Sequence, residues 1–587
     1  MRSRSGLDRN ARTRAGRARG AAHGGGGAAA VGTGAAGTGS AGTVADGWRR
    51  RLRARAAIAA RAPALLVMLA VLVALFFRLG AVPLFDVDEG AFSEATREML
   101  ARGDYVSTWL NGQPRFDKPI LIYWLQALSV TLFGTSEFAF RLPSALAAAA
   151  WIAAIAVFTR DWTTHDRVDR AGGHAAAFIA ATTAGVTVIG RGAIADALLN
   201  LFLALAMFDI MRYAAEAQAP LQRRYCRRAY LWIGLGLLTK GPVALLVPAA
   251  AGFLGFALQR RLPAWWRAVR DPGGWLILLA VAAPWYLLEY ARRGDDFLAG
   301  FFMRHNVERF LAPLQGHGGG ALYYVPALLL VLLPYSGPFL KVLPNLLDLR
   351  RPRGATGSPD AFLWSWFLFV FVFFSFAGTK LPHYLLYGVT PLFILMARAR
   401  HTLCSGWLVF VPPLVLLAAV AALPWLLDRF VAGIRNAYVR EALGRTEVFG
   451  AAWHAGAGLL LGAGLGLALW RRAPPWPRLA ATGLLCAGAL GGLLLPAVGA
   501  LQQGPVKEAA LLARRAGWDV HSWRINVPSF SVYRAAVTPA TQQPRPGQVI
   551  LTRSDALEAL PPPAAGPGPG VRILYRKGGI VLLRMPD

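Results

Sequence analysis

The sequence predicts a mainly α-helical protein that crosses a membrane many times. Hydrophobic residues make up 55% of the 587 residues, and charged residues make up only 16%. The mean hydropathy is +0.42, which suits a membrane protein better than a series of soluble domains. Runs close to the roughly 20 apolar residues needed to cross a bilayer recur along the chain, and Arg-rich turns separate them. These observations together favour many spans.

The net charge of +31 could point to a nucleic-acid partner. The basic residues, however, lie in the N-terminal segment and between apolar runs, a placement that the positive-inside rule explains more simply. We therefore expect no nucleic-acid binding. The three cysteines, Cys226, Cys404 and Cys486, show neither metal-ligand spacing nor a pairing pattern, so no disulfide is expected.

Residues 1–61 are rich in Arg, Gly and Ala and of low complexity. Such a segment cannot bury a core, so it predicts a disordered, basic cytoplasmic tail. It is too long for the start of a signal peptide, and no clean cleavage site follows residue 77. The apolar run at 62–81 is therefore interpreted as an uncleaved first span.

Placing the tail and all Arg-rich turns in the cytoplasm gives one consistent topology of 13 spans, with the C-terminus outside. A span at 119–134 would reverse the sidedness of everything after it, so this segment is interpreted as a helix lying on the outer leaflet, within an outer loop at 82–137. The predicted spans are 62–81, 138–159, 173–190, 196–213, 229–239, 242–258, 274–291, 321–341, 361–378, 383–398, 405–424, 449–470 and 479–501.

The last 86 residues differ in kind from the rest of the chain. VKEAALLARRAG has helical periodicity, whereas DVHSWRINV, QVILTR, VRILYR and GIVLLR are short and rich in β-branched residues, as strands are. The sequence thus predicts a membrane domain at 62–501 followed by a small outer α/β domain at 502–587.

This topology gathers a second set of polar residues on the outer face. Ionisable groups so near hydrocarbon are costly and usually functional. Lys and Arg would hold a phosphate-linked lipid, and a carboxylate would orient or deprotonate an acceptor. The set comprises Asp86, Asp88, Glu89, Glu94, Asp117, Lys118, Arg191, Asp196, Lys240, His305, Glu308, Arg309 and Lys380.

Several motifs carry a family resemblance. They are Asp88-Glu89 followed by SEATREML, then NGQPRFDKPILIYW, FGTSEFAFRLPSAL, RGAIADALL, LLTKGPVALLVP, HNVERF and KLPHYLLY. Together they resemble the aminoarabinose lipid A transferases (ArnT-like) and, more distantly, the protein O-mannosyltransferases, which are both GT-C membrane glycosyltransferases. The resemblance implies a GT-C fold of about 13 transmembrane helices, surface helices in the first loop and an outer C-terminal domain.

The resemblance also implies roles for particular residues. Asp88, Glu89 and Asp196 are the candidate catalytic residues, with Asp88 as the essential first-loop acid. Asp117 and His305 could hold a divalent cation, since His and carboxylate suit several metals; no other cofactor is expected. The candidate contacts to the donor phosphate or the substrate are Lys118, Lys240, Arg309 and Lys380.

The function that the resemblance implies is transfer of a sugar, with inversion, from polyprenyl (undecaprenyl) phosphate to lipid A or a related envelope acceptor. It would occur on the periplasmic face of the bacterial inner membrane. The family tends to have an arginine shortly after the acidic pair, where this chain has Ala91 and Phe92, and FEKP where this chain has FDKP. These departures leave the sugar and the acceptor open.

Two alternatives remain from the sequence. One is a protein O-glycosyl (mannosyl) transferase that uses the same class of donor, although the chain lacks the HPP-type residues of that branch near Asp117. The other is a transporter or flippase of polyprenyl-linked sugars. A transporter would show inverted repeats and polar residues near the bilayer midplane, and the sequence shows neither.

Overall fold

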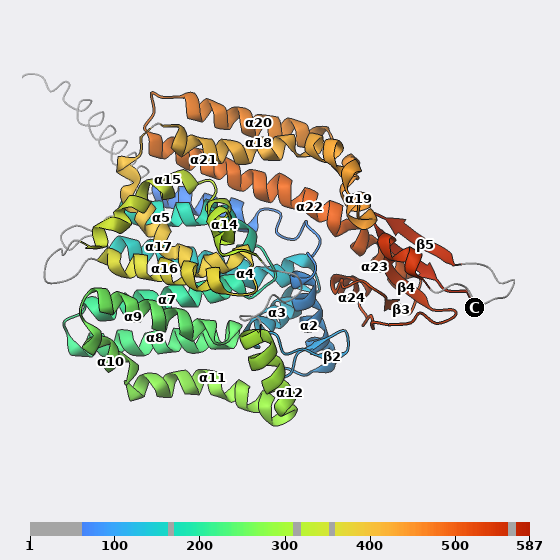
Figure 1. The fold of residues 1–587 in the computed structure, drawn as a ribbon, viewed down its shortest axis with the longest axis horizontal. Helices are drawn as coiled ribbons and strands as arrows, with labels where there is room; N and C mark the ends of the chain where they lie inside the picture. Colours follow the sequence, from blue (N-terminus) through green and yellow to red (C-terminus); the bar gives the residue numbers. More distant parts are fainter. Residues whose placement is uncertain are drawn as a thin grey trace, which may run out of the picture. The chain divides into compact units, whose positions relative to one another are not determined.

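The computed structural model describes residues 62–162, 170–308, 319–350, 359–404, 406–560 and 571–586. Residues Ala62–Asp587 form one compact unit, mainly of helices that run side by side, with a small sheet near the C-terminus (Figure 1). The predicted tail at 1–61 lies outside the described residues. The predicted boundary between 501 and 502 stays a prediction.

The first loop folds into two helices that flank a short hairpin. Helix α2 (Asp88–Arg102) ends at Gly103, whose φ of 66° gives the left-handed conformation common after helices. Strands β1 (Trp109–Leu110) and β2 (Gln113–Pro114) pair through an Asn-Gly turn, the strongest short hairpin signal. The apolar helix α3 (Leu121–Phe133) has 13 residues, which is short for a span and fits the predicted surface helix.

The following helices form the main bundle. Within the described residues, contacts between α7 and α8, between α8 and α11, and between α4 and α5 join helices that are neighbours in Figure 1. The first apolar helix spans Ala62–Phe76 and ends in η1 (Leu72–Phe76). The elements after the first loop are α4 (Glu137–Trp162), α5 (Arg170–Thr182), α6 (Ala184–Gly190), α7 (Asp196–Ala215), α8 (Ala219–Lys240), α9 (Val243–Leu258), α10 (Leu262–Val269), α11 (Pro272–Arg293), α12 (Asp295–Phe297), η2 (Leu298–Glu308), η3 (Ala321–Tyr323), α14 (Tyr324–Val331), α15 (Ser336–Val342) and η4 (Leu343–Arg350). They are followed by α16 (Pro359–Phe376), η5 (Pro382–Leu385), α17 (Leu386–Arg398), η6 (Ala399–Thr402), α18 (Trp407–Phe430), η7 (Val431–Gly433), α19 (Ala437–Leu443), η8 (Thr446–Val448), α20 (Ala451–Leu469), α21 (Pro475–Ala489), η9 (Leu490–Leu494) and α22 (Leu495–Gln502).

The number of membrane crossings is only partly defined. Among the described residues, six helices are long and apolar enough to cross a membrane, or eight if each of two bent pairs counts as one span. The bent pairs are Ala171–Thr182 with Ala184–Gly190, and Ala321–Val331 with Ser336–Leu347. Shorter apolar helices, such as α9 and α16, lie at the positions of further predicted spans. A multi-spanning helical fold is confirmed, whereas the count of 13 is not.

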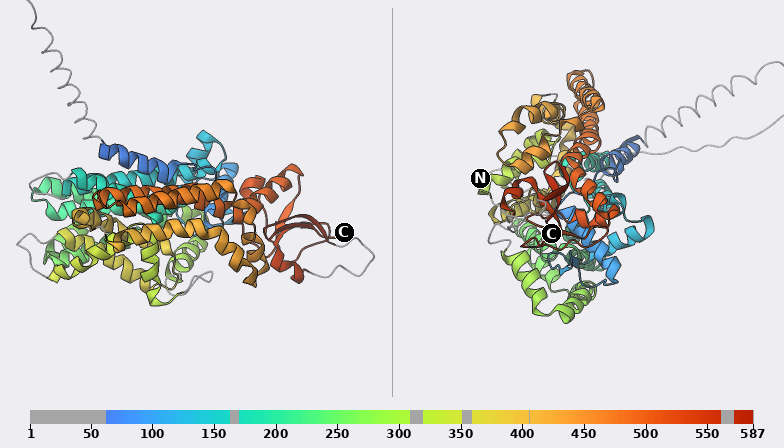
Figure 2. Two further views of the ribbon diagram at one scale, coloured as in Figure 1. Left: turned by 90° about the horizontal axis from the view of Figure 1, so that it is seen from above. Right: turned by 90° about the vertical axis from the view of Figure 1, so that its right-hand side faces the viewer.

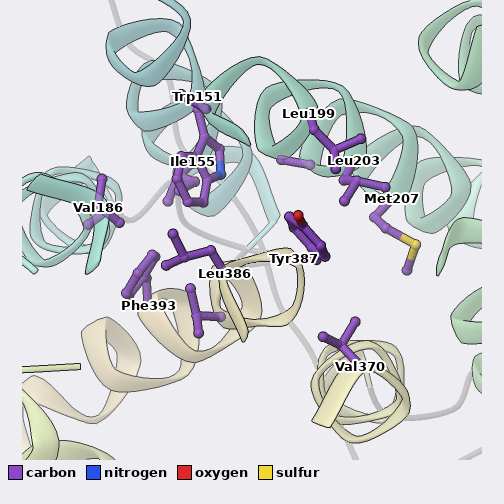
Figure 3. Close-up of a cluster of buried hydrophobic side chains, with 14 of the residues drawn as sticks. Trp151, Ile155, Val186, Leu199, Leu203, Met207, Val370, Leu386, Tyr387 and Phe393 are labelled. Atoms are coloured by element: carbon purple, nitrogen blue, oxygen red, sulfur yellow. The ribbon is translucent and has the colours of Figure 1, made fainter. Parts of the chain in front are cut away.

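A buried cluster packs α4, α6, α7, α16 and α17 together (Figure 3). Its polar side chains find partners: the Trp151 indole donates to Thr390 at 3.0 Å, and the Trp366 indole donates to the carbonyl of Tyr387 at 2.6 Å. A buried N–H without an acceptor would cost stability. These bonds therefore tie the start of α17, which carries Tyr387, to α4 and α16.

The C-terminal part contains a small sheet, drawn in red in Figure 2. Its four strands follow the order β3-β4-β6-β5. Strands β3 and β4 pair in parallel, and the other neighbours are antiparallel; Gly578 and Gly579, both with positive φ, make the turn between β5 and β6. All four strands lie at the segments predicted as strands, and β5 extends one residue beyond its segment, to Lys577. The elements are α23 (Gly504–Arg515), β3 (Val520–Ser522), α24 (Ser529–Arg534), β4 (Val549–Arg553), η10 (Ser554–Ala559), β5 (Arg572–Lys577) and β6 (Ile580–Arg584).

Helix α24 packs against α2, so the C-terminal part holds the first loop. The Tyr533 hydroxyl accepts a hydrogen bond from the backbone N–H of Leu84 at 2.7 Å. The Glu137 carboxylate accepts from Tyr533 and pairs with Lys507. These contacts tie the helices of the C-terminal part to the segment before α2 and to the start of α4.

Candidate active site

A cavity of about 360 Å³ lies where the first loop, the bundle and the C-terminal part meet. The residues that line the cavity come from the start of α2, the loop before α3, the start of α7, the end of α8, η2, η5 and one position after β3. Both carboxylates and basic side chains line it. Its ionisable lining residues are Asp88, Arg115, Asp117, Lys118, Asp196, Lys240, Arg304, His305, His383 and Tyr384.

Asp88 opens onto this cavity from the first position of α2. Its side chain is exposed, and no side-chain capping bond is found at this helix start, so α2 does not need the carboxylate for capping. Asp88 also borders a second cavity of about 330 Å³, which Arg141 and Arg191 line. The carboxylate is therefore accessible from two sides.

Asp117 and its neighbours form a compact charged group. The Arg115 guanidinium donates to both Asp117 oxygens, at 2.5 and 2.8 Å. The Lys118 ammonium lies 3.7 Å from the same carboxylate and donates to the Asp117 carbonyl at 3.0 Å. Although burial opposes it, these cations and His305 hold the pKa of Asp117 below its usual range. The group keeps a net positive charge beside the cavity.

Asp196 and Lys240 form a buried pair between the start of α7 and the end of α8. The Lys240 ammonium donates to Asp196 Oδ1 at 2.6 Å, and the Tyr387 hydroxyl donates to the same oxygen at 2.7 Å. His383 Nε2 lies 3.7 Å from that oxygen. Because the ammonium also lies over the rings of Tyr384 and Tyr387, its position is fixed from three directions.

Glu89 has a different setting from its neighbour Asp88. Its carboxylate is buried and accepts two bonds from Arg141, at 2.9 and 2.7 Å, and one each from the backbone N–H groups of Ala193 and Phe85. Burial alone would raise the pKa of Glu89, but the Arg141 charge and these bonds lower it. Glu89 ties the first loop to α4 and to the segment before α7. Its predicted catalytic role stays a prediction.

Among the described residues, Lys380 is not one that lines the cavity. The Lys380 ammonium is buried and donates to the carbonyls of Ser375 and Ala377, at 2.6 and 2.8 Å, at the end of α16. Cations suit such a helix end, where carbonyls lack partners. Arg309 lies outside the described residues. The substrate contacts predicted for both stay predictions.

The divalent cation predicted at Asp117 and His305 fits this geometry poorly. Both residues line the cavity, but Arg115 binds both carboxylate oxygens, and Lys118 lies beside them. A divalent cation would have to displace these positive groups. Among the described residues, no group of three or more His, Cys, Asp or Glu could hold a metal ion. We therefore derive no chemical step through a metal.

Sequence reasoning missed several residues of this site. Arg115, His383, Tyr387 and Asn526 either line the cavity or hold groups that do. Arg115 lies in the motif NGQPRFDKPILIYW, two residues before Asp117, and His383 lies in KLPHYLLY, three residues after Lys380. Their basic side chains could therefore have been included among the candidate site residues. Tyr387 ends the motif KLPHYLLY, but its hydrogen bond to Asp196 could not be read from that motif, and Asn526 reaches the site through tertiary packing alone.

Asp86 links the first loop to the C-terminal part. Its half-buried carboxylate accepts from the backbone N–H and the hydroxyl of Ser529 at the start of α24. Burial, only partly offset by these bonds, raises the pKa of Asp86 from 3.8 to about 7. The carboxyl group is therefore easier to protonate in the folded protein than in the unfolded chain.

This shift predicts a pH dependence of stability. Between pH 3.8 and about 7 the folded state keeps the Asp86 proton that the unfolded chain has lost, so the free energy of unfolding falls as the pH rises through this range. Asp86→Asn keeps an acceptor for Ser529 and removes the titration. We expect the midpoint of thermal unfolding in detergent to depend less on pH between 4 and 7 in this variant than in the wild type. An unchanged pH profile would contradict a raised Asp86 pKa.

Comparisons with known proteins agree with this architecture. A family model described as dolichyl-phosphate-mannose-protein mannosyltransferase matches residues 117–287. The chain is 33% identical over 341 residues to the undecaprenyl phosphate-alpha-4-amino-4-deoxy-L-arabinose arabinosyl transferase of Serratia proteamaculans, covering 56% of this chain and 58% of that one. The protein of the same name from Yersinia enterocolitica is 33% identical over 353 residues, with 57% and 60% covered. The matches thus span less than two thirds of these relatives.

A solved structure decides the fold. The crystal structure of ArnT from Cupriavidus metallidurans bound to undecaprenyl phosphate superposes with a TM-score of 0.72 at 20% identity, covering 89% of this chain and 97% of that one. The chain has an ArnT-like GT-C fold. The apo form of the same protein gives a TM-score of 0.70 with 92% and 98% covered. The resemblance on which the sequence predictions rested is therefore confirmed.

Proposed function

We propose that this chain is a membrane glycosyltransferase that moves a sugar from a polyprenyl phosphate, of the undecaprenyl type, to lipid A or a related envelope acceptor. The observation that carries the proposal is the cavity itself, which Asp88, Lys118 and Lys240 line together. The names of the similar proteins, which include undecaprenyl phosphate, support the donor class. The name of the matching family model supports lipid-phosphate-linked sugars in general.

The proposed reaction breaks the bond between the anomeric carbon and the phosphate oxygen of the donor. Negative charge grows on that phosphate as it leaves, and Lys118 and Lys240 stabilise it as point charges. The acceptor oxygen forms the new bond on the opposite face, which inverts the anomeric carbon. If the acceptor is a hydroxyl, its proton passes to Asp88. If it is a phosphate, no proton has to be removed, and Asp88 orients hydroxyl groups of the substrates by accepting their hydrogen bonds.

Asp196 acts in this scheme as a positioning residue. Oδ1 of Asp196 accepts hydrogen bonds from the Lys240 ammonium and the Tyr387 hydroxyl. Asp196 thereby fixes the ammonium at the cavity wall, and two of the three N–H bonds of the ammonium are left for other acceptors. Because Lys240 also donates to the Tyr387 oxygen at 2.7 Å, one N–H of the ammonium is left for a ligand in the cavity that Lys240 lines. The pair therefore prepares one donor for the phosphate in advance.

The position of the site favours transfer over transport. Asp196 is the first residue of α7 and Lys240 the last of α8, so the charged groups lie at helix ends rather than at mid-helix. A transporter of lipid-linked sugars would carry its polar residues near the midplane. A protein O-glycosyltransferase would use the same cavity, and only the acceptor separates it from the favoured function.

The proposed location is the bacterial inner membrane, with the N-terminus in the cytoplasm and the C-terminal sheet in the periplasm. The multi-spanning fold and the ArnT-like architecture support a membrane protein. The Arg-rich turns support the orientation. The cavity then opens on the periplasmic side, where lipid A would meet it.

Mass spectrometry of envelope lipids and glycans tests this function. We expect cells lacking the gene to lose a sugar-modified species that wild-type complementation restores. A restored mass on lipid A would establish the favoured acceptor, and one on protein would establish the alternative. An unchanged profile of lipids and glycoproteins would contradict both.

The phosphate contacts give a more specific prediction. Lys118→Gln and Lys240→Gln should each reduce transfer by purified protein roughly 10²–10³-fold, the usual cost of losing one donor that stabilises a developing oxyanion. Lys341→Gln at the end of α15, outside the cavity, is the matched control. Transfer measured with a polyprenyl-phosphate sugar should be unaffected in this control. Equal activity in all three variants would remove the lysines from the mechanism.

A further inference from the structure

A basic cavity lies at the other end of α8 from the candidate active site. It measures about 610 Å³ and is lined by Ala219, Pro220, Arg223, Arg224, Arg227, Arg228, Leu231 and Ile277. From Arg223 to Lys240 the helix rises by roughly 25 Å at about 1.5 Å per residue. This distance is close to the thickness of the hydrocarbon core, so the two cavities belong to opposite membrane surfaces.

The four arginines share one face of α8. Positions 220, 223, 224, 227, 228 and 231 follow the three- and four-residue spacing of a single helical stripe. This stripe faces the neighbouring helix α11, which contributes Ile277 (Figure 1). The positive-inside rule accounts for arginines at this end of a helix, but it does not require all four to line one cavity.

The cavity keeps a positive charge after its internal ion pairs are counted. Arg227 pairs with Asp271 at 3.3 Å, and Arg228 pairs with Asp209 at 3.1 Å. Arg223 and Arg224 are exposed, and neither forms an ion pair with a residue in the described ranges. Two guanidinium groups therefore remain available for an anion.

The walls of the cavity change from charged to apolar along α8. Leu231 and Ile277 form the part nearer the middle of the bundle. Next to Ile277, Leu276 and Leu279 of α11 are exposed apolar side chains, 70% and 52% accessible, as expected of a surface in contact with lipid tails. A ligand that fills this cavity would have a phosphate at the arginines and hydrocarbon at the leucines.

We propose that this cavity binds the headgroup of an anionic phospholipid at the membrane surface opposite the candidate active site. Arg223 and Arg224 bind the phosphate, for which the planar guanidinium is well suited. The first acyl carbons lie against Leu231 and Ile277. Basic pockets between transmembrane helices on the cytoplasmic side, where the predicted topology places this end of α8, recognise anionic headgroups by this chemistry.

Native mass spectrometry of the full-length protein in detergent tests the proposal. The protein is titrated with phosphatidylglycerol and, separately, with phosphatidylcholine of the same acyl chains. We expect phosphatidylglycerol to bind more tightly, and Arg223→Gln/Arg224→Gln to weaken it about 30-fold, since each basic residue near an anionic lipid surface contributes about 1 kcal/mol. Arg471→Gln/Arg472→Gln, which removes the same charge from the turn between α20 and α21, should leave the affinity unchanged.

A second variant tests the apolar part without altering charge. Ile277→Trp fills the end of the cavity and should weaken phosphatidylglycerol several-fold. Equal losses in both double-arginine variants would show a net-charge effect and overturn the proposal. Equal binding of phosphatidylcholine, which has the same phosphate but no net charge, would overturn the selectivity for an anionic headgroup. Competition by inorganic phosphate at millimolar concentration would show a site for free phosphate instead of a lipid.

Discussion

Replacing Asp88 with asparagine is expected to reduce sugar transfer roughly 10²–10⁴-fold, the usual contribution of a general base, if the acceptor is a hydroxyl. The variant should fold normally, because the exposed carboxylate makes no capping bond at the start of α2. If the acceptor is a phosphate, no proton has to leave, and the asparagine carbonyl can still accept hydrogen bonds from hydroxyl groups of the substrates. Measurable activity should then remain in the variant. The size of the loss thus reports on the acceptor.

Asp296→Asn is the matched control for this experiment. Asp296 is also exposed, lies in the short helix α12 and does not line the cavity. Transfer rates and thermal midpoints should be measured for both variants in the same detergent. Full activity of Asp88→Asn would exclude both the base and the orienting role. A lowered thermal midpoint in Asp88→Asn would instead point to a structural role of the carboxylate.

The sequence predicted the helical membrane fold and the small sheet because their signals are local. Apolar runs near the length of a span and short β-branched segments follow directly from composition and periodicity. The number of crossings did not follow, because a helix such as α9, with 16 residues, is short for a span by length alone. Bends such as the one between α5 and α6 also change the number of spans, because two bent helices can form one span.

The candidate site could be predicted only in part for a related reason. Asp88, Lys118, Asp196 and Lys240 belong to motifs that a resemblance can carry, and all four line the cavity. Which of these charges are already paired inside the protein depends on residues far away in the chain. In the sequence the ammonium of Lys380 looks like a free cation, yet it is held by carbonyls at the end of α16.

Glu89 shows the same limit and gives the second large prediction. In the sequence Glu89 is an acidic residue directly beside Asp88, but its carboxylate is buried against Arg141. The Arg141 guanidinium also donates to the carbonyls of Leu79, Val82 and Pro83. Removing one partner of a buried ion pair leaves a charge without compensation, which costs about 3–5 kcal/mol. Glu89→Ala should therefore lower the stability by about that amount, measured as unfolding by denaturant or heat in detergent.

A double-mutant cycle separates structure from chemistry at Glu89. Arg141→Met removes the charge that Glu89 compensates, so Glu89→Gln/Arg141→Met should be less unstable than the sum of the single variants predicts. In all variants of the cycle, sugar-transfer activity should fall in proportion to the amount of folded protein. The reason is that Glu89 supports activity only by holding in place the first loop, which carries Asp88. A stable but inactive Glu89→Gln would contradict this view and give the carboxylate a part in the reaction. The two adjacent acids would then divide the chemistry between the cavities on either side of Asp88.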